Sequence, residues 1–112
     1  MKLLLIEDDR PSLNALAAAL KMLGFDNEAF SNPEEAIALF QSERDFDVVI
    51  TDLKMPKIDG KEVLNKIRGL DPTIPVIVIT AHRDHLPLRA NRIFYKPIDI
   101  QALVKFLNQL QN

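Results

Sequence analysis

Short continuous apolar runs alternate along the chain with stretches whose apolar residues recur every three or four positions. The continuous runs are long enough to be buried strands, and a weaker, more polar run at 26–30 indicates an edge strand. Strands that are apolar at every position are buried on both faces, which is typical of parallel sheets. The pattern therefore predicts five strands connected by helices on both faces of the sheet. The four continuous runs are residues 3–6, 48–51, 76–79 and 93–95.

The helical stretches carry start and stop signals. The first helix begins at Pro11 and ends at Gly24, and the second begins with a sequence that resembles a capping box, 32–35. The third is expected to end at Gly69, and Asp99 is expected to cap the last. The residues expected to face the core are, helix by helix, Leu13, Leu16, Leu20 and Leu23; Ala36, Ile37, Leu39 and Phe40; Val63, Leu64 and Ile67; and Leu103, Phe106, Leu107 and Leu110.

Each continuous apolar run ends on residues that can handle a phosphate or a metal. These are Glu7, Asp8 and Asp9 after the first run, Asp52 after the second, Thr80 after the third and Lys96 after the last. In an open parallel sheet the carboxyl ends of the strands lie along one edge, and ligands bind where the strand order reverses. With a doubly wound strand order of 2-1-3-4-5, the acidic residues lie on neighbouring strands. The sequence therefore predicts one site at this edge.

The acidic cluster at this edge requires a cation. Like charges about 4 Å apart cost roughly 1 kcal/mol per pair even in bulk water. Mg²⁺ suits a few carboxylates at an open edge because it keeps some of its waters and shares its shell with phosphate. The simpler interpretation is that acids after a strand only cap a helix. That interpretation suits Asp9 and fits Asp52 poorly, because a loop with Pro56 and Gly60 follows Asp52.

Thr80 and Lys96 favour phosphoryl-transfer chemistry at the same edge. A carboxylate can accept a phosphoryl group and form an acyl phosphate. The oxygens of the transferred group need positive charge and hydrogen-bond donors, which a metal, a hydroxyl and an ammonium supply. Taken singly, a Thr at a strand end and a Lys-Pro turn are ordinary features. Together, in this order, they predict a phosphoryl-accepting site.

The motifs resemble those of the receiver domain of two-component response regulators, the CheY-like proteins, from one end of the chain to the other. The resemblance rests on 6–9 (Ile-Glu-Asp-Asp), 52–60 (Asp-Leu-Lys-Met-Pro-Lys-Ile-Asp-Gly), 80–81 (Thr-Ala) and 96–97 (Lys-Pro), of which 52–60 is the most specific. It implies the flavodoxin-like or CheY-like fold: an α/β, doubly wound, five-stranded parallel sheet in the order 2-1-3-4-5. It also implies a histidine kinase or phosphotransfer protein as phosphoryl donor and a downstream protein target.

The resemblance assigns a role to each candidate site residue. It implies that Asp52 is the phosphoacceptor, Thr80 the switch hydroxyl and Lys96 the phosphate-binding cation, with a cis Lys96-Pro97 peptide. The Mg²⁺ ligands that it implies are Asp8 directly, Glu7 through water, Asp52, and the backbone carbonyl of Lys54. Asp9 is a flanking acid, and the side chains of Lys54 and His82 occupy positions that tune hydrolysis. Such a domain is not an enzyme beyond its own phosphoryl transfer and dephosphorylation.

The chain departs from the family pattern between Thr80 and Lys96. Ile93 stands where the family usually has an aromatic residue, and Tyr95 shares its strand face. The segment is about six residues shorter than the family pattern, and Pro87 stands where the fourth helix would run, at a cost of about 3 kcal/mol inside a helix. The fourth helix is therefore expected to be missing or cut to one turn. His82 and His85 are interpreted as loop residues, because no third metal ligand is near.

Composition limits the chain to one compact domain. Its 112 residues, 47% of them hydrophobic, suit a single core, and we expect residues 1–112 to be one receiver domain with no output domain. The net charge of -2 and the scattered basic residues give no nucleic-acid footprint. The chain has no cysteine, and Glu7 interrupts the first apolar run too early for a signal peptide or a membrane span. These features predict a cytoplasmic protein.

Other interpretations remain open at the level of sequence. A metal-dependent phosphotransfer enzyme of another fold could place acids at strand ends, but it would need a substrate pocket that this chain has few residues to form. A flavodoxin-type cofactor binder would need a phosphate loop after the first strand, where 7–9 would repel phosphate. The remaining alternative is a degenerate receiver that acts as a phosphorylation-independent protein-interaction module.

Overall fold

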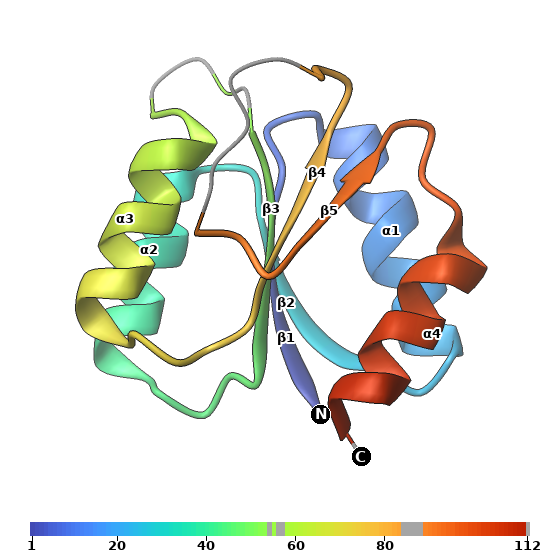
Figure 1. Cartoon of the computed structure of the whole chain (residues 1–112), viewed down its shortest axis with the longest axis horizontal. Helices are drawn as coiled ribbons and strands as arrows, with labels where there is room; N and C mark the ends of the chain where they lie inside the picture. Colours follow the sequence, from blue (N-terminus) through green and yellow to red (C-terminus); the bar gives the residue numbers. More distant parts are fainter. Residues whose placement is uncertain (54, 56–57, 84–88, 112) are drawn as a thin grey trace.

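Five parallel strands form one sheet with helices on both faces (Figure 1). The computed structural model describes residues 1–53, 55, 58–83 and 89–111. The strands are β1 (Lys2–Ile6), β2 (Asp26–Phe30), β3 (Val48–Asp52), β4 (Val76–Thr80) and β5 (Arg92–Tyr95), in the order β2-β1-β3-β4-β5. The helices are α1 (Arg10–Met22), α2 (Pro33–Ser42), α3 (Gly60–Leu70) and α4 (Ile100–Gln111). The predicted fold class and strand order are confirmed.

The helices form two layers, each with its own apolar core. Helices α2 and α3 pack on one face of the sheet around Phe40 and Ile67, and α1 and α4 pack on the other around Leu20 and Leu103 (Figure 1). Every residue of β3 and of β4 is buried, which explains their continuous apolar sequences.

Side-chain oxygens cap the helices as the sequence predicted. Asn32 begins α2 by accepting from the Glu34 N–H, and Asp99 accepts from the first turn of α4. Asp9 begins α1 in the same way, by accepting from the Ser12 N–H. The caps orient the helix starts at the carboxyl edge of the sheet.

Two helix-end predictions were wrong. Gly69 does not end α3 but lies inside it, because Asp71 takes the C-cap position and Gly69 keeps helical geometry. Leu23 does not face the core: it caps the C-terminus of α1, where Gly24 turns the chain with φ +93°, and it is 53% exposed. The physical reason is that the 3.6-residue periodicity stops applying once the chain leaves the helix.

The described residues between β4 and β5 contain no helix, as the short segment predicted. Residues 81–83 and 89–91 are irregular, while 84–88, including Pro87 and His85, lie outside the described residues. Arg68 of α3 holds the return of the chain: its guanidinium donates to the carbonyls of Ile74 and Arg89 and to Oδ1 of Asn91. This anchor fixes where β5 begins.

Candidate functional site

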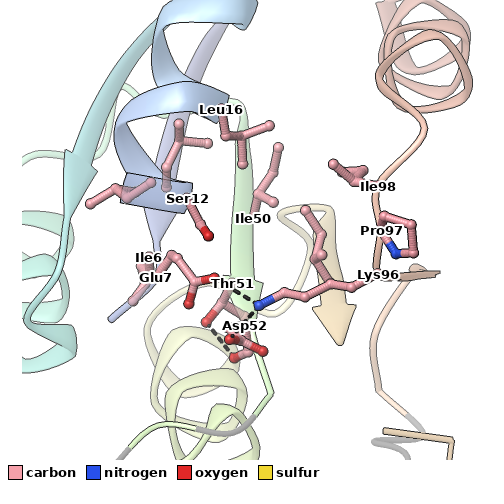
Figure 2. Close-up of a pocket in the computed structure, with 13 residues that line it drawn as sticks. Ile6, Glu7, Ser12, Leu16, Ile50, Thr51, Asp52, Lys96, Pro97 and Ile98 are labelled. Carbon is pink, nitrogen blue, oxygen red and sulfur yellow. Dashed lines mark hydrogen bonds and ion pairs between the residues drawn. The ribbon is translucent and has the colours of Figure 1, made fainter. Parts of the chain in front are cut away.

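Three side chains that are far apart in sequence meet at the carboxyl edge of the sheet. The Lys96 ammonium donates to Oε1 of Glu7 at 2.8 Å and to Oδ2 of Asp52 at 3.0 Å (Figure 2). Glu7 follows β1, Asp52 ends β3 and Lys96 follows β5. The parallel strands thus bring together the residues that the sequence predicted for this edge.

The electrostatics of this trio are set by burial. Glu7 is 7% exposed and Asp52 8% exposed. Burial and the nearby Asp52 carboxylate raise the pKa of Glu7 to about 7, against the opposing effect of Lys96. Burial lowers the pKa of the Lys96 amine, but its bonds to Glu7 and Asp52 outweigh this and leave the pKa raised. Lys96 therefore stays charged at neutral pH.

The two oxygens of Asp52 are in different environments. Oδ1 accepts from the Leu53 N–H at 2.7 Å, whereas Oδ2 is paired with Lys96. The backbone of Asp52 is also tightly enclosed, since a Cβ at Gly60 would lie 2.5 Å from the Asp52 carbonyl oxygen. The Gly60 N–H bonds to the Leu53 carbonyl at 2.6 Å, which ties the start of α3 to the end of β3.

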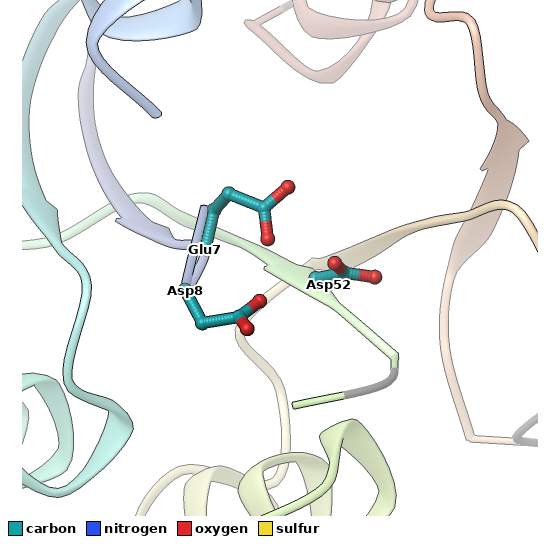
Figure 3. Close-up of side chains that lie close together, drawn as sticks. All are labelled: Glu7, Asp8 and Asp52. Carbon is teal, nitrogen blue, oxygen red and sulfur yellow. The ribbon is translucent and has the colours of Figure 1, made fainter. Parts of the chain in front are cut away.

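Glu7, Asp8 and Asp52 form a cluster of oxygen donors that fits a hard divalent cation. One carboxylate oxygen from each lies within 4.8 Å of the others (Figure 3). Oε2 of Glu7 is buried with no hydrogen-bond partner in the described part of the chain, so it can accept from a metal-bound water. An all-oxygen, partly open set of this kind suits Mg²⁺. Lys54, whose carbonyl was a further candidate ligand, lies outside the described residues.

Asp9 and Thr80 lie at the same edge of the sheet but make hydrogen bonds outside the acidic cluster. Asp9 points its carboxylate into the first turn of α1, and hydrogen bonds to Ser12 lower its pKa. Thr80 is fully buried, and its Oγ1 accepts from the His82 N–H at 3.0 Å. The Lys96-Pro97 peptide is cis, as predicted.

Sequence reasoning missed two features around this site. One is a cavity of about 180 Å³, mostly apolar, between α1 and the segment after β5, with Glu7, Asp52 and Lys96 in its wall (Figure 2). The other is a stack of the Arg83 guanidinium on the Tyr95 ring, 4.0 Å from its centroid. The cavity has no local sequence signal, whereas the position of Tyr95 beside Thr80 could have been found from the strand register.

The chain belongs to the family described as response regulator receiver domain, which matches residues 3–108. It is a receiver domain of two-component signal transduction. The transcriptional regulatory protein QseB of Haemophilus influenzae is 40% identical to this chain over 89 aligned residues. The alignment covers 80% of this chain and 39% of that protein. The C4-dicarboxylate transport regulator DctD of Rhizobium meliloti is 38% identical over 90 residues, 80% of this chain and 19% of its own length.

Solved receiver domains share the fold almost completely. A response regulator receiver domain from Clostridium thermocellum superposes with a TM-score of 0.90 at 30% identity and covers 97% of this chain and 92% of its own. The response regulator TrrA of Thermotoga maritima, in complex with Mg²⁺ and BeF, superposes with a TM-score of 0.88 at 28% sequence identity. The superposition covers 97% of each chain. Receiver domains bind Mg²⁺ at an acidic pocket, and this chain has such a pocket.

The chain spans 19% of the length of DctD, 39% of that of QseB and 50% of that of the response regulator MprA of Mycolicibacterium vanbaalenii. It therefore covers half or less of the length of these curated relatives. Within the described residues, no helix is long and apolar enough to cross a membrane.

Proposed function

We propose that Asp52 is the phosphoacceptor of this receiver domain and takes its phosphoryl group from a histidine kinase or phosphotransfer protein. The observation that supports the proposal most directly is that the Lys96 ammonium binds the buried carboxylates of Asp52 and Glu7 at once, at a partly exposed edge of the sheet. An ammonium held beside a carboxylate at a strand end can stabilise the oxygens of a phosphoryl group formed there. A downstream protein then recognises the phosphorylated form.

The attacking atom in this proposal is Oδ2 of Asp52. Oδ1 accepts from the backbone N–H of Leu53, whereas Oδ2 bonds the Lys96 ammonium, a side chain that can move with it onto a phosphoryl group. A new P–O bond forms to Oδ2 while the bond from phosphorus to the donor's imidazole nitrogen breaks, and that nitrogen keeps the electron pair. Lys96, which already bonds Oδ2 at 3.0 Å, then contacts the phosphoryl oxygens.

Glu7, Asp8 and Asp52 would hold Mg²⁺, with the Lys54 carbonyl as the additional ligand suggested by the family resemblance. When bound, the ion supplies positive charge against both the carboxylates and the incoming phosphoryl group. Asp8 offers the partly exposed carboxylate of the cluster, and Glu7 the buried oxygen that lacks a partner. Thr80 supplies a hydroxyl from the next strand, β4.

Incubation with acetyl phosphate and Mg²⁺, followed by intact mass measurement, tests the proposal. The wild type should gain one phosphoryl group, Asp52→Asn none, and excess EDTA should prevent the gain. Asp9→Asn is the matched control: it removes a charge from the same edge, keeps a residue that caps helices well, and should be labelled normally. Normal labelling of Asp52→Asn would show that the acceptor lies elsewhere.

A further inference from the structure

The cavity between α1 and the segment after β5 has an apolar end and a polar end (Figure 2). Leu16, Ile50 and Ile98 line the apolar end, and the Lys96 ammonium with the two carboxylates that it binds forms the polar end. Voids larger than a water molecule are few in a close-packed domain. This one has a volume of about 180 Å³, and an apolar cavity of about 150 Å³ binds benzene. The apolar end therefore has room for a six-membered ring.

The cavity can be reached from solvent. Ser12, Lys96 and Pro97 line it and are exposed, whereas Leu5 and Ile79 line it and are buried. Its mouth thus lies between the first turn of α1 and the chain that follows β5, and its floor is the sheet. A small molecule can enter by this mouth while the helices stay in place.

Two side chains at the mouth offer complementary hydrogen-bonding groups. The Lys96 ammonium carries three N–H groups and donates two hydrogen bonds within the described residues, so one N–H remains for a ligand. The Ser12 hydroxyl donates its proton to Asp9, which leaves its oxygen able to accept. A ligand hydroxyl fits both groups, because it accepts from Lys96 and donates to Ser12.

Charges of both signs at the polar end disfavour a charged ligand. The carboxylates of Glu7 and Asp52 repel an anionic group, and the Lys96 ammonium repels a cationic one, both more strongly than in bulk water because the trio is partly buried. We propose that this cavity binds a small neutral alcohol. Its ring-sized apolar body fills the apolar end, and its hydroxyl bonds Lys96 and Ser12.

The bound alcohol also opposes phosphorylation, and this part of the inference rests on the proposed function of Asp52. A phosphoryl group on Asp52 draws the N–H groups of Lys96 to its oxygens, and the ligand hydroxyl needs one of the same groups. Each ligand therefore weakens the binding of the other by the same factor, as thermodynamic linkage requires.

NMR titrations with benzyl alcohol test the site without Mg²⁺ or a phosphoryl donor. Benzyl alcohol should shift the amide signals of Leu16 and Ile98 saturably at millimolar concentration. Toluene, which has the ring but no hydroxyl, should bind more weakly, and benzylamine and benzoate should leave these signals unchanged. Ser12→Ala should weaken the binding of benzyl alcohol by about 2- to 10-fold, the effect of one hydrogen bond, and should leave that of toluene unchanged.

Variants that fill the cavity from opposite walls separate this site from loose binding at the surface. Ser12→Leu and Ile98→Phe should each abolish the binding of benzyl alcohol, and the same spectra report whether each variant is folded. Ser42→Leu is the matched control, because it adds the same apolar group at an exposed position of α2 and should bind normally. Normal binding by either folded cavity variant, equal binding of the four probes, or no saturable shift in the wild type would overturn the site.

Beryllofluoride with Mg²⁺, a phosphoryl mimic whose binding ¹⁹F NMR reports, tests the coupling separately. Bound beryllofluoride should raise the dissociation constant of benzyl alcohol. An unchanged dissociation constant with the mimic bound would overturn the coupling alone. No bound ¹⁹F signal that depends on Asp52 would overturn the proposed function and the coupling with it, whereas the alcohol site is decided by the titrations without the mimic.

Discussion

The protonation of Glu7 affects the stability of the folded state. Its carboxyl has a pKa of about 7 in the folded protein, against 4.5 for an ordinary Glu, because it is buried beside Asp52. The folded state therefore binds this proton more tightly than the unfolded state does. The protonated form contributes stability that is fully present below about pH 4.5 and is lost as the pH rises toward 7.

Glu7→Gln should remove this pH dependence. In EDTA, the free energy of unfolding of the wild type should fall between pH 5 and 7 relative to that of the variant, by up to roughly 1.4 kcal/mol per pH unit. Urea unfolding at several pH values measures it. Glu34→Gln, at an exposed position in the first turn of α2, is the control. Parallel curves for wild type and Glu7→Gln would mean that Glu7 is not strained by burial.

Asp8→Asn should relieve repulsion within the acidic cluster. Removing one of the three clustered charges is worth roughly 1 kcal/mol, so the melting temperature in EDTA should rise by about 4 °C. Millimolar Mg²⁺ should raise the melting temperature of the wild type more than that of the variant, since the variant has lost a ligand. A variant that melts lower in EDTA and responds normally to Mg²⁺ would contradict a metal role for Asp8.

At the scale of elements, the contact between the start of α3 and the end of β3 positions the phosphoacceptor. Gly60 approaches so closely that an added Cβ would lie 2.5 Å from the Asp52 carbonyl oxygen and 2.6 Å from the Leu53 Cα. Gly69, in the last turn of the same helix, has no atom within 4 Å of such a Cβ. A side chain at Gly60 would therefore clash with the backbone of β3 and the residue after it, whereas Gly69 has room for one.

The same substitution at these glycines should have opposite effects. Gly60→Ala should destabilise the protein by roughly 2 kcal/mol or more and slow the phosphorylation of Asp52, because backbone atoms must move apart. Gly69→Ala should stabilise it by roughly 0.5–1 kcal/mol, because alanine loses less backbone entropy in a helix. Chemical denaturation and acetyl phosphate labelling of both variants measure these effects. Equal stability changes would contradict the close contact at Gly60.

At the scale of the whole molecule, Arg68 links α3 to the chain on both sides of the β4–β5 connection. It is 8% exposed and bonds to the loop before β4 and to the segment before β5. Oδ1 of Asn91 also accepts from the Val76 N–H, so the same cluster fixes the starts of both strands. Residues 89–91 are thereby held on the side of α3.

Arg68→Met should cost roughly 2–3 kcal/mol of stability, because buried carbonyls lose a charged donor. Arg44→Met is the matched control. Arg44 also donates to a backbone carbonyl, that of Leu70, but at an exposed position, and its loss should cost less than about 1 kcal/mol. Thermal and urea unfolding measure the difference. Similar losses for the two variants would show that the buried anchor does not hold residues 89–91.

The sequence by itself determined the elements, their order and the edge that carries the chemistry. Continuous apolar runs such as 76–79 can be stable only when buried on both faces, and parallel strands then place Asp52 and Lys96 at one edge. Helix starts such as Asp99 were also readable, because capping is a local hydrogen-bonding effect. The stop of α1 at Gly24 was readable as well, since the left-handed turn there favours glycine. The exposure of Leu23 and the end of α3 beyond Gly69 were not readable.

Only the tertiary structure decided which residues at that edge contact one another. The pairing of Lys96 with both Glu7 and Asp52, the raised pKa of Glu7 and the stack of Arg83 on Tyr95 depend on distances across strands, which no local pattern encodes. The role of Asp9 was likewise settled by direction, because its carboxylate turns into α1 and not toward the cluster. Sequence specifies which groups reach the edge, whereas burial and side-chain direction specify which of them interact.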